Sequence, residues 1–377
     1  MGAGARGEGA CTVAEEAFTV GVEEEFHVVD AETLDLQPAA GDLVAAARTR
    51  VGDQAQQELL ADQIEIETTV CRSLDEVRHE LVRLRRHVAE VAEAQGRCIV
   101  ASGTHPFSTF EGQRVTDKER YVTMEHDYQQ LAREQHICGS HVHVGVADDD
   151  VAVRAMDRTR PWLAVLRALS ANSPFWQGDD TGYASYRTQV FDRWPTSGSP
   201  APLGSRASFD AVREAMLATG VMRDAGALYW DIRPSARYAT LELRVADVGT
   251  TVDEDVMLAG LFRALVRRCH ADVEQGAPIE HPRPEVVRLA RWRAARDGLE
   301  GSLIDLDEGR PVTARVAVDR LLGFVRDDLE AHEEWEEVSE LVSRQLAHGS
   351  GARRQRAVAE QRGLRAVAAD LAARTVA

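Results

Sequence analysis

The stretch Phe18-Thr-Val-Gly-Val-Glu-Glu-Glu-Phe-His-Val-Val29 decides how the rest of the chain is interpreted. It is typical of one β-strand, in which side chains alternate between two faces, so Glu23 and Glu25 share one face while Glu24 lies on the apolar one. Two carboxylates on one face repel each other and lose hydration when they are buried, and a divalent cation would neutralise both. The alternative at this point is an edge strand whose glutamates are solvated.

The composition indicates a globular protein with few polyanionic partners. The chain has 377 residues, a hydrophobic fraction of 44% and a formal net charge of −18. This length permits two or three domains, or one large α+β domain, and the charge argues against nucleic acid and membrane surfaces as partners. Five widely spaced cysteines and the lack of a long apolar run predict reduced thiols and a cytoplasmic location.

The acidic pattern recurs in a second predicted strand, which begins at Gln63. Glu65 and Glu67 alternate there with isoleucines, and Glu58 lies just before the strand. A third strand carries two imidazoles on one face, His141 and His143, and a glycine follows them. Paired histidines at i and i+2 favour metal ligation or substrate contact over a buried core histidine.

A fourth strand places a carboxylate and a guanidinium side by side, at Glu242 and Arg244, with Arg233 upstream. A plain salt bridge is one interpretation; the other acidic strands favour Glu242 on a metal and Arg244 on phosphate. Between the third and fourth strands, residues 172–205 lack periodicity and are rich in aromatics, which predicts an ordered loop at a substrate pocket. Arg187 and Arg193 are its candidates for binding a carboxylate.

Acidic side chains on one face of successive strands would form a concave, oxygen-rich surface. Hard cations such as Mg²⁺ or Mn²⁺ take carboxylate ligands and tolerate one imidazole, whereas a zinc hydrolase would use more His or Cys. Several metals beside arginines suit nucleotide phosphates. The chain has neither a Walker A motif nor a Rossmann glycine fingerprint, so ATP would be held by metals and arginines.

Five segments over residues 18–330 follow the order of one known family. They are Gly21-Val-Glu-Glu-Glu-Phe26, Glu58-Leu-Leu with Glu65, Gly139-Ser-His-Val-His-Val-Gly145, Ser185-Tyr-Arg187 with Arg193-Trp-Pro195, and Trp230-Asp-Ile-Arg-Pro234 with Leu241-Glu-Leu-Arg-Val-Ala-Asp247. Together they resemble the carboxylate–amine ligases, the second type of glutamate–cysteine ligase and distant relatives of glutamine synthetase. The resemblance implies an α+β fold in which an antiparallel sheet forms a funnel for ATP and Mg²⁺. It also implies amide-bond formation between an acid and an amine through an acyl phosphate.

The resemblance also assigns residues by motif. The implied metal ligands are Glu23, Glu25, Glu58, Glu65, His141 and Glu242. The implied substrate contacts are His143, Arg187, Arg193 and Ser185, and the implied catalytic and phosphate-binding residues are Arg244 and Arg233. Small-molecule acid and amine substrates follow from the family, but their identity does not.

Two other activities remain open: a guanidino kinase of the same fold, and a metal-dependent hydrolase that uses the H-x-H strand. We expect a disordered leader over residues 1–16 and a single catalytic domain over residues 17–377 with a helical C-terminal part, whose surface would allow a homodimer. Predicted helices include 117–134, 151–170, 253–275, 311–330 and 352–373.

Overall fold

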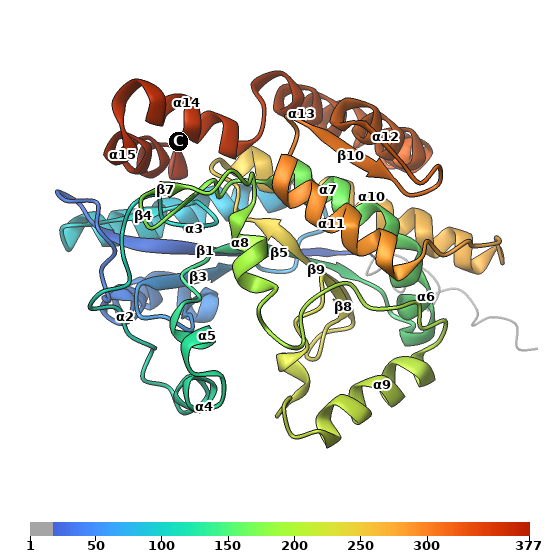
Figure 1. Cartoon of the computed structure of the whole chain (residues 1–377), viewed down its shortest axis with the longest axis horizontal. Helices are drawn as coiled ribbons and strands as arrows, with labels where there is room; N and C mark the ends of the chain where they lie inside the picture. The colour runs from blue at the N-terminus through green and yellow to red at the C-terminus, as the bar shows by residue number, and fades with distance from the viewer. Residues whose placement is uncertain (1–17) are drawn as a thin grey trace, which may run out of the picture.

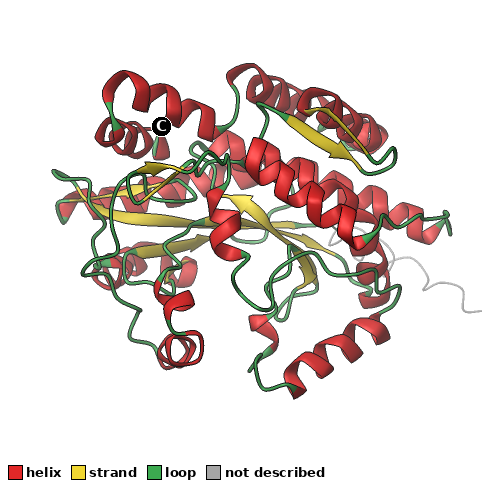
Figure 2. Ribbon diagram, viewed as in Figure 1, coloured by secondary structure: helices red, strands yellow, loops and turns green. Residues whose placement is uncertain are grey.

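The computed structural model describes residues 18–377, so the leader expected at residues 1–16 lies outside the described part of the chain. The described residues form a seven-stranded antiparallel sheet in the order β2-β3-β1-β5-β9-β8, with β4 paired to the last part of β1. Its strands are β1 (Val20–Asp30), β2 (Ala55–Gln57), β3 (Gln63–Glu67), β4 (Arg97–Val100), β5 (Gly139–Gly145), β8 (Ile232–Pro234) and β9 (Thr240–Asp247). Figure 2 shows this sheet at the centre of the molecule, with helices on both sides.

One face of the sheet is apolar, as the alternation in β1 predicts. Val20, Val22, Phe26 and Val28 are all buried there. The helices that pack on this face are α3 (Leu74–Ala94), α6 (Asp149–Thr159), α7 (Leu163–Ser170) and α10 (Val252–Glu274). At the start of helix α3 the Ser73 side chain caps the helix: its hydroxyl accepts a hydrogen bond of 3.2 Å from the Glu76 backbone N–H.

Helix α10 is apolar around most of its circumference because further helices cover its outer side. The helices that cover α10 belong to a set of peripheral elements. The set consists of α2 (Ala40–Val51), α11 (Pro284–Asp297), α12 (Ala314–Ala331), α13 (Trp335–His348), α14 (Gly351–Arg362), α15 (Leu364–Thr375) and the hairpin β10 (Ser302–Asp305) with β11 (Arg310–Thr313). On the opposite side of the sheet Figure 1 shows α4 (Glu119–Tyr128), α5 (Gln130–Arg133), α8 (Tyr186–Phe191) and α9 (Arg206–Ala218).

Several predicted elements have different bounds in the structure. The helices predicted at 117–134 and 352–373 are each two helices, because Gln129 (φ 51°) and Gly363 (φ 80°) adopt left-handed backbone conformations that end an α-helix. The helix predicted at 151–170 is interrupted by a 3₁₀ turn at Pro161. The loop predicted at 172–205 contains α8 and a short hairpin, β6 (Phe175–Trp176) with β7 (Asp179–Asp180). The first residues of the helix predicted at 311–330 belong instead to strand β11 of the β10–β11 hairpin.

Two expectations from composition can be compared with the described residues. None of the helices described here combines the length and the apolar character needed to cross a bilayer. Cys71, Cys98, Cys138 and Cys269 are all free thiols, which agrees with the predicted lack of a disulfide framework over residues 18–377.

A buried ion cluster joins the apolar face of β1 to the helices behind it. Glu24 is fully buried, and both of its oxygens accept from Arg85 of α3, at 2.9 Å from Nε and 2.7 Å from Nη2. Arg85 also donates to Asp255 of α10 (2.9 Å) and to three backbone carbonyls, including that of Thr375 in α15. The one carboxylate on the apolar face is thus neutralised from within the protein.

We predict that Arg85→Met destabilises the fold by about 3–5 kcal/mol, because it leaves the buried Glu24 carboxylate without a countercharge and removes a hydrogen bond to Asp255. Urea unfolding monitored by circular dichroism measures this loss. The matched control is Arg83→Met on the same helix, whose pair with Glu80 is partly exposed and is worth about 0–1 kcal/mol. Equal losses of unfolding free energy in the two variants would contradict the assignment.

Candidate active site

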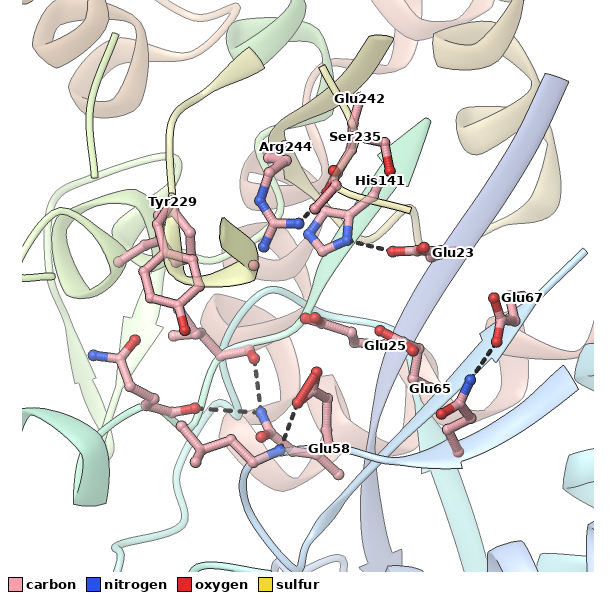
Figure 3. Close-up of a pocket in the computed structure, with 18 of the residues that line it drawn as sticks. Glu23, Glu25, Glu58, Glu65, Glu67, His141, Tyr229, Ser235, Glu242 and Arg244 are labelled. Carbon is pink, nitrogen blue, oxygen red and sulfur yellow. Dashed lines mark hydrogen bonds and ion pairs between the residues drawn. The ribbon is translucent and has the colours of Figure 1, made fainter. Parts of the chain in front are cut away.

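The charged face of the sheet forms the floor of a pocket of about 250 Å³. Six glutamates and five arginines line it: Glu23, Glu25, Glu58, Glu65, Glu67, Glu242, Arg120, Arg187, Arg233, Arg237 and Arg244. Figure 3 shows the carboxylates of β1 and β3 facing the imidazole of His141 and the guanidinium of Arg244 across this pocket. The structure therefore brings together all six predicted metal ligands.

Strand register is what makes these residues neighbours. In the antiparallel pairs, Glu23 lies opposite Glu67 on one side and His141 on the other, and Glu25 lies opposite Glu65. Residues on one face that lie directly opposite each other have Cβ atoms about 4.5–5.5 Å apart. The pairs His143–Glu242 and Glu242–Arg233 extend the same lattice across β5, β9 and β8.

The two histidines of β5 differ in their surroundings. His141 Nδ1 lies 2.9 Å from Glu23 Oε2, while its buried Nε2 has no hydrogen-bond partner among the described residues. Burial and the nearby Arg244 lower the pKa of His141 to about 4, so the ring is neutral at neutral pH and offers a lone pair. His143 lies between Glu23 (3.2 Å) and the Thr240 hydroxyl (3.0 Å). Although burial opposes it, the hydrogen bond to Glu23 raises the pKa of His143 and favours its charged form.

Two groups of side chains in the pocket could each hold a metal ion. Glu23, His141 and Glu242 form one, and Glu25, Glu65 and His141 form the other; within each group the ligand atoms lie within 4.8 Å of one another. The donors are mainly carboxylate oxygens, which suits Mg²⁺ or Mn²⁺. His141 Nε2, which has no hydrogen-bond partner among the described residues, could serve as a further metal ligand. The residues present therefore fit a divalent cation site.

Two of the pocket carboxylates, Glu25 of β1 and Glu65 of β3, are buried beside other carboxylates. Burial raises the pKa of Glu65 well above its usual range, and the charges of Glu23 and Glu58 raise it further. Burial together with the Glu58 charge raises the pKa of Glu25 to about 7, against the opposing charge of Arg187. Bound cations would relieve this crowding, which makes the arrangement typical of a preformed metal site.

Glu242 is held by two arginines. Arg233 donates to both of its oxygens, at 2.8 and 3.1 Å, and Arg244 also pairs with it. Burial alone would raise the pKa of Glu242, but the charges of Arg244 and Arg233 outweigh burial and lower that pKa, so the carboxylate is ionised. The salt bridge considered in the sequence analysis is real, and it keeps the predicted metal ligand in its binding form.

The two arginines are not equivalent. Arg233 has its remaining donors on the Gly226 and Leu228 carbonyls, at 2.9 and 2.6 Å, so its guanidinium is committed to positioning Glu242. The phosphate contact predicted for Arg233 does not fit this arrangement. Arg244 lines the pocket, and its Nε has no partner among the described residues, so it retains donors for an anion.

Arg187 is buried beside the pocket without a countercharge in direct contact. It is 2% exposed, makes no ion pair within residues 18–377, and its Nε lacks a hydrogen-bond partner there. Its guanidinium lies 5.3 Å from the Phe191 ring centroid. A desolvated, unpaired guanidinium that faces a pocket is suited to an anionic ligand.

Two predicted substrate contacts lie elsewhere. Arg193 pairs with Glu134 and does not line the pocket, since its guanidinium holds the end of α8 against α5. Ser185 is buried and donates to Asp247 (2.8 Å), so it fixes the start of α8 rather than contacting the pocket. Neither side chain lines the pocket, because a shared motif does not determine which way a loop side chain points.

Several residues of the pocket wall were not predicted from the sequence. Glu67 faces the pocket and is held by the Gln56 amide; its place in the alternation of β3 was a visible signal. Tyr121 of α4 and Tyr229 also line the pocket, with the Tyr121 hydroxyl 3.4 Å from Glu58. No local pattern marks these two tyrosines.

The sequence of the chain matches a known protein family. The family described as glutamate–cysteine ligase family 2 matches residues 19–369. A Frankia alni protein named "Putative glutamate–cysteine ligase 2-2" is 44% identical, over 92% of this chain and 93% of its own length. A Frankia casuarinae relative of the same name is 44% identical over 93% of this chain, but the chain spans only 40% of that relative's length.

Comparisons of structure give the fold. A glutamate–cysteine ligase of Francisella tularensis, solved in complex with AMP, superposes with a TM-score of 0.72 at 13% identity, over 96% of this chain and 89% of that one. A bifunctional glutathione synthetase of Pasteurella multocida gives a TM-score of 0.69 at 16% identity, over 96% of this chain and 53% of that one. The expected α+β fold with an antiparallel sheet is confirmed, and both of these proteins share the fold. By the extent of the sequence match, the chain belongs to glutamate–cysteine ligase family 2.

Proposed function

We propose that the protein is an ATP-dependent carboxylate–amine ligase that joins a glutamate-like acid to an amine, as a glutamate–cysteine ligase does. The main support for the proposal is that one pocket holds two sets of possible metal ligands together with Arg244 and Arg187. The Nε atom of each arginine lacks a hydrogen-bond partner among the described residues. Membership of the family supports the reaction class. The identity of the amine stays open, and a homodimer and a cytoplasmic location stay predictions.

The metal ligands have separable roles in this proposal. Glu23, His141 and Glu242 would hold one Mg²⁺ or Mn²⁺, and Glu25 with Glu65 would hold another, with Glu58 beside them. Such cations neutralise the charge of a nucleotide triphosphate and orient its γ-phosphoryl group. Glu23 keeps His141 in place through the bond to Nδ1, which leaves Nε2 free.

In this proposal the acid reacts in two steps, phosphorylation and then amide formation. A carboxylate oxygen of the acid attacks the γ-phosphorus, the bond from that phosphorus to ADP breaks, and an acyl phosphate forms. The amine nitrogen then attacks the carbonyl carbon, the C–O bond to phosphate breaks, and a proton leaves the nitrogen as the amide forms. Arg244 would stabilise the charge on the transferred phosphoryl group, and Arg187 would bind a second carboxylate of the acid.

The two alternative activities have less support. A hydrolase built on the H-x-H strand would use both imidazoles as ligands, whereas only His141 belongs to the candidate cation groups and His143 is held between Glu23 and Thr240. A guanidino kinase would transfer the phosphoryl group to a stable product and form no amide.

The first test is trapping of the acyl phosphate. With ATP, Mg²⁺ and L-glutamate, hydroxylamine should yield a hydroxamate, because a neutral nucleophile attacks an activated acyl group. The iron(III) colour assay measures the product, and ADP release should depend on the acid. The control omits ATP, and chelation with excess EDTA should abolish the reaction. If no hydroxamate forms, and a guanidine compound supplied in place of glutamate is converted to a stable phosphorylated product, the kinase is supported instead.

A second prediction concerns the pH dependence of stability in the absence of metal. Because burial and Glu58 raise the pKa of Glu25 to about 7, the folded protein holds a proton that the unfolded chain loses at about pH 4.3. This contribution to stability is complete below the unfolded pKa and is lost as the pH rises through about 7. The Glu25→Gln variant lacks this titrating group, so its stability does not fall in this way. Between about pH 5 and pH 8 its melting temperature should therefore rise relative to that of the wild type.

Differential scanning fluorimetry in EDTA measures this gain. Excess Mg²⁺ should reverse it, because only the wild-type carboxylate binds the cation. The control Glu32→Gln alters an exposed glutamate in a turn after β1 and should show no pH-dependent difference. A Glu25→Gln difference that stays constant over this pH range would argue against the crowded carboxylates.

A third prediction separates the two loop arginines. Arg187→Ala should lower kcat/KM for the acid by roughly 10- to 1000-fold, mainly through KM, because it removes a buried charge-assisted contact. The KM for ATP should change little. Arg193→Ala is the matched control and should stay within about threefold of the wild type, since a partly exposed ion pair is worth little. Steady-state ADP release measures both; similar effects in the two variants would remove Arg187 from the site.

A further inference from the structure

Gly139 is the first residue of β5 and lies two residues before His141 on the charged face. It is not among the residues of the described chain with positive φ, so its backbone conformation suits any amino acid. What sets it apart is space. A Cβ atom built at Gly139 would lie 2.7 Å from Cζ and 3.0 Å from Nε of Arg187, closer than van der Waals contact allows.

The Arg187 guanidinium thus lies directly over the backbone of β5, in a slot that exists because Gly139 has no side chain. The Phe191 ring, 5.3 Å from the guanidinium, also borders this slot. The backbone N–H of Arg187 donates to the Ser173 hydroxyl (3.0 Å), which fixes the start of its side chain. These contacts hold the Arg187 guanidinium in place without an ion pair, so its positive charge stays available to a ligand.

The same glycine also contacts a candidate metal ligand. Its backbone N–H donates to Glu25 Oε2 at 2.5 Å. Any amino acid except proline can make this bond, so a substitution by alanine would keep the bond to Glu25 and fill only the slot of Arg187. The effect on the arginine can therefore be separated from the effect on the candidate cation group.

We propose that Gly139 is a positioning residue for the acid substrate: its missing side chain forms the slot that holds Arg187 against β5 and orients the guanidinium toward the pocket. The inference rests on the proposed function, in which Arg187 binds a carboxylate of the acid. A methyl group at position 139 would push the flexible end of Arg187 out of the slot while the fold stays intact.

The control lies on the neighbouring strand of the same face. Gly21 of β1 pairs with His143, and a Cβ atom built there would meet only the His143 Cβ, at 3.8 Å, which is ordinary contact. Gly21→Ala therefore adds the same methyl group to the same sheet without displacing an arginine.

The experiment is a double-mutant cycle with Gly139→Ala, Arg187→Ala and the double variant, read by hydroxamate formation from ATP and L-glutamate. Gly139→Ala should lower kcat/KM for glutamate by about 10- to 100-fold through KM, with the KM for ATP within about twofold. In the Arg187→Ala background the same substitution should change kcat/KM by less than about twofold, because the slot is already empty. Gly21→Ala should match the wild type.

The inference is overturned if Gly139→Ala matches the wild type, or if it costs as much with Arg187 absent as with Arg187 present. A crystal structure of Gly139→Ala gives an answer that needs no turnover: a displaced Arg187 guanidinium supports the slot, and an unmoved one overturns it. Failure of the proposed function looks different, because the wild type itself would then form no hydroxamate while the crystallographic result would stand.

Discussion

Antiparallel pairing of β1 with β3 and β5 is the constraint on which the rest of the site depends. Because side chains alternate along a strand, the register that sets Glu23 opposite Glu67 and His141 also sets Glu25 opposite Glu65. A slip of one residue would turn these carboxylates toward the helices α3 and α10 and the apolar residues toward the pocket. The buried valines of β1 and the ion pair of Glu24 with Arg85 both oppose such a slip.

The two faces of β1 treat buried carboxylates in opposite ways. On the helix side, Glu24 receives a complete counterion from Arg85 within the fold. On the pocket side, burial raises the pKa of both Glu25 and Glu65, and the charges of neighbouring carboxylates raise it further. The first arrangement stabilises the protein by itself, and the second is completed by a ligand. Such a contrast is typical of functional sites, where side chains that destabilise the ligand-free protein form a preorganised binding surface.

Three arginines around the pocket differ in how far the protein satisfies them. Arg233 is fully committed to Glu242 and two carbonyls, Arg244 is shared between Glu242 and the pocket, and Arg187 has no ion pair among the described residues. A guanidinium with free donors in a desolvated site gains most from an anionic ligand. The gradation supports distinct roles: one arginine that positions a ligand residue, one for the phosphoryl group and one for the acid.

The strands and their charged faces could be predicted from the sequence alone, since a two-residue period is a local property that does not depend on the fold. Five of the six predicted metal ligands line one pocket for that reason, and the sixth, Glu58, lies in the connection between β2 and β3. Which residues of the loops face the pocket was decided only by tertiary structure. Arg187 and Arg193 share a motif, yet α8 turns one into the site and the other toward Glu134. Likewise, the commitment of Arg233 and the slot at Gly139 arise from contacts between segments far apart in the chain, which no local pattern contains.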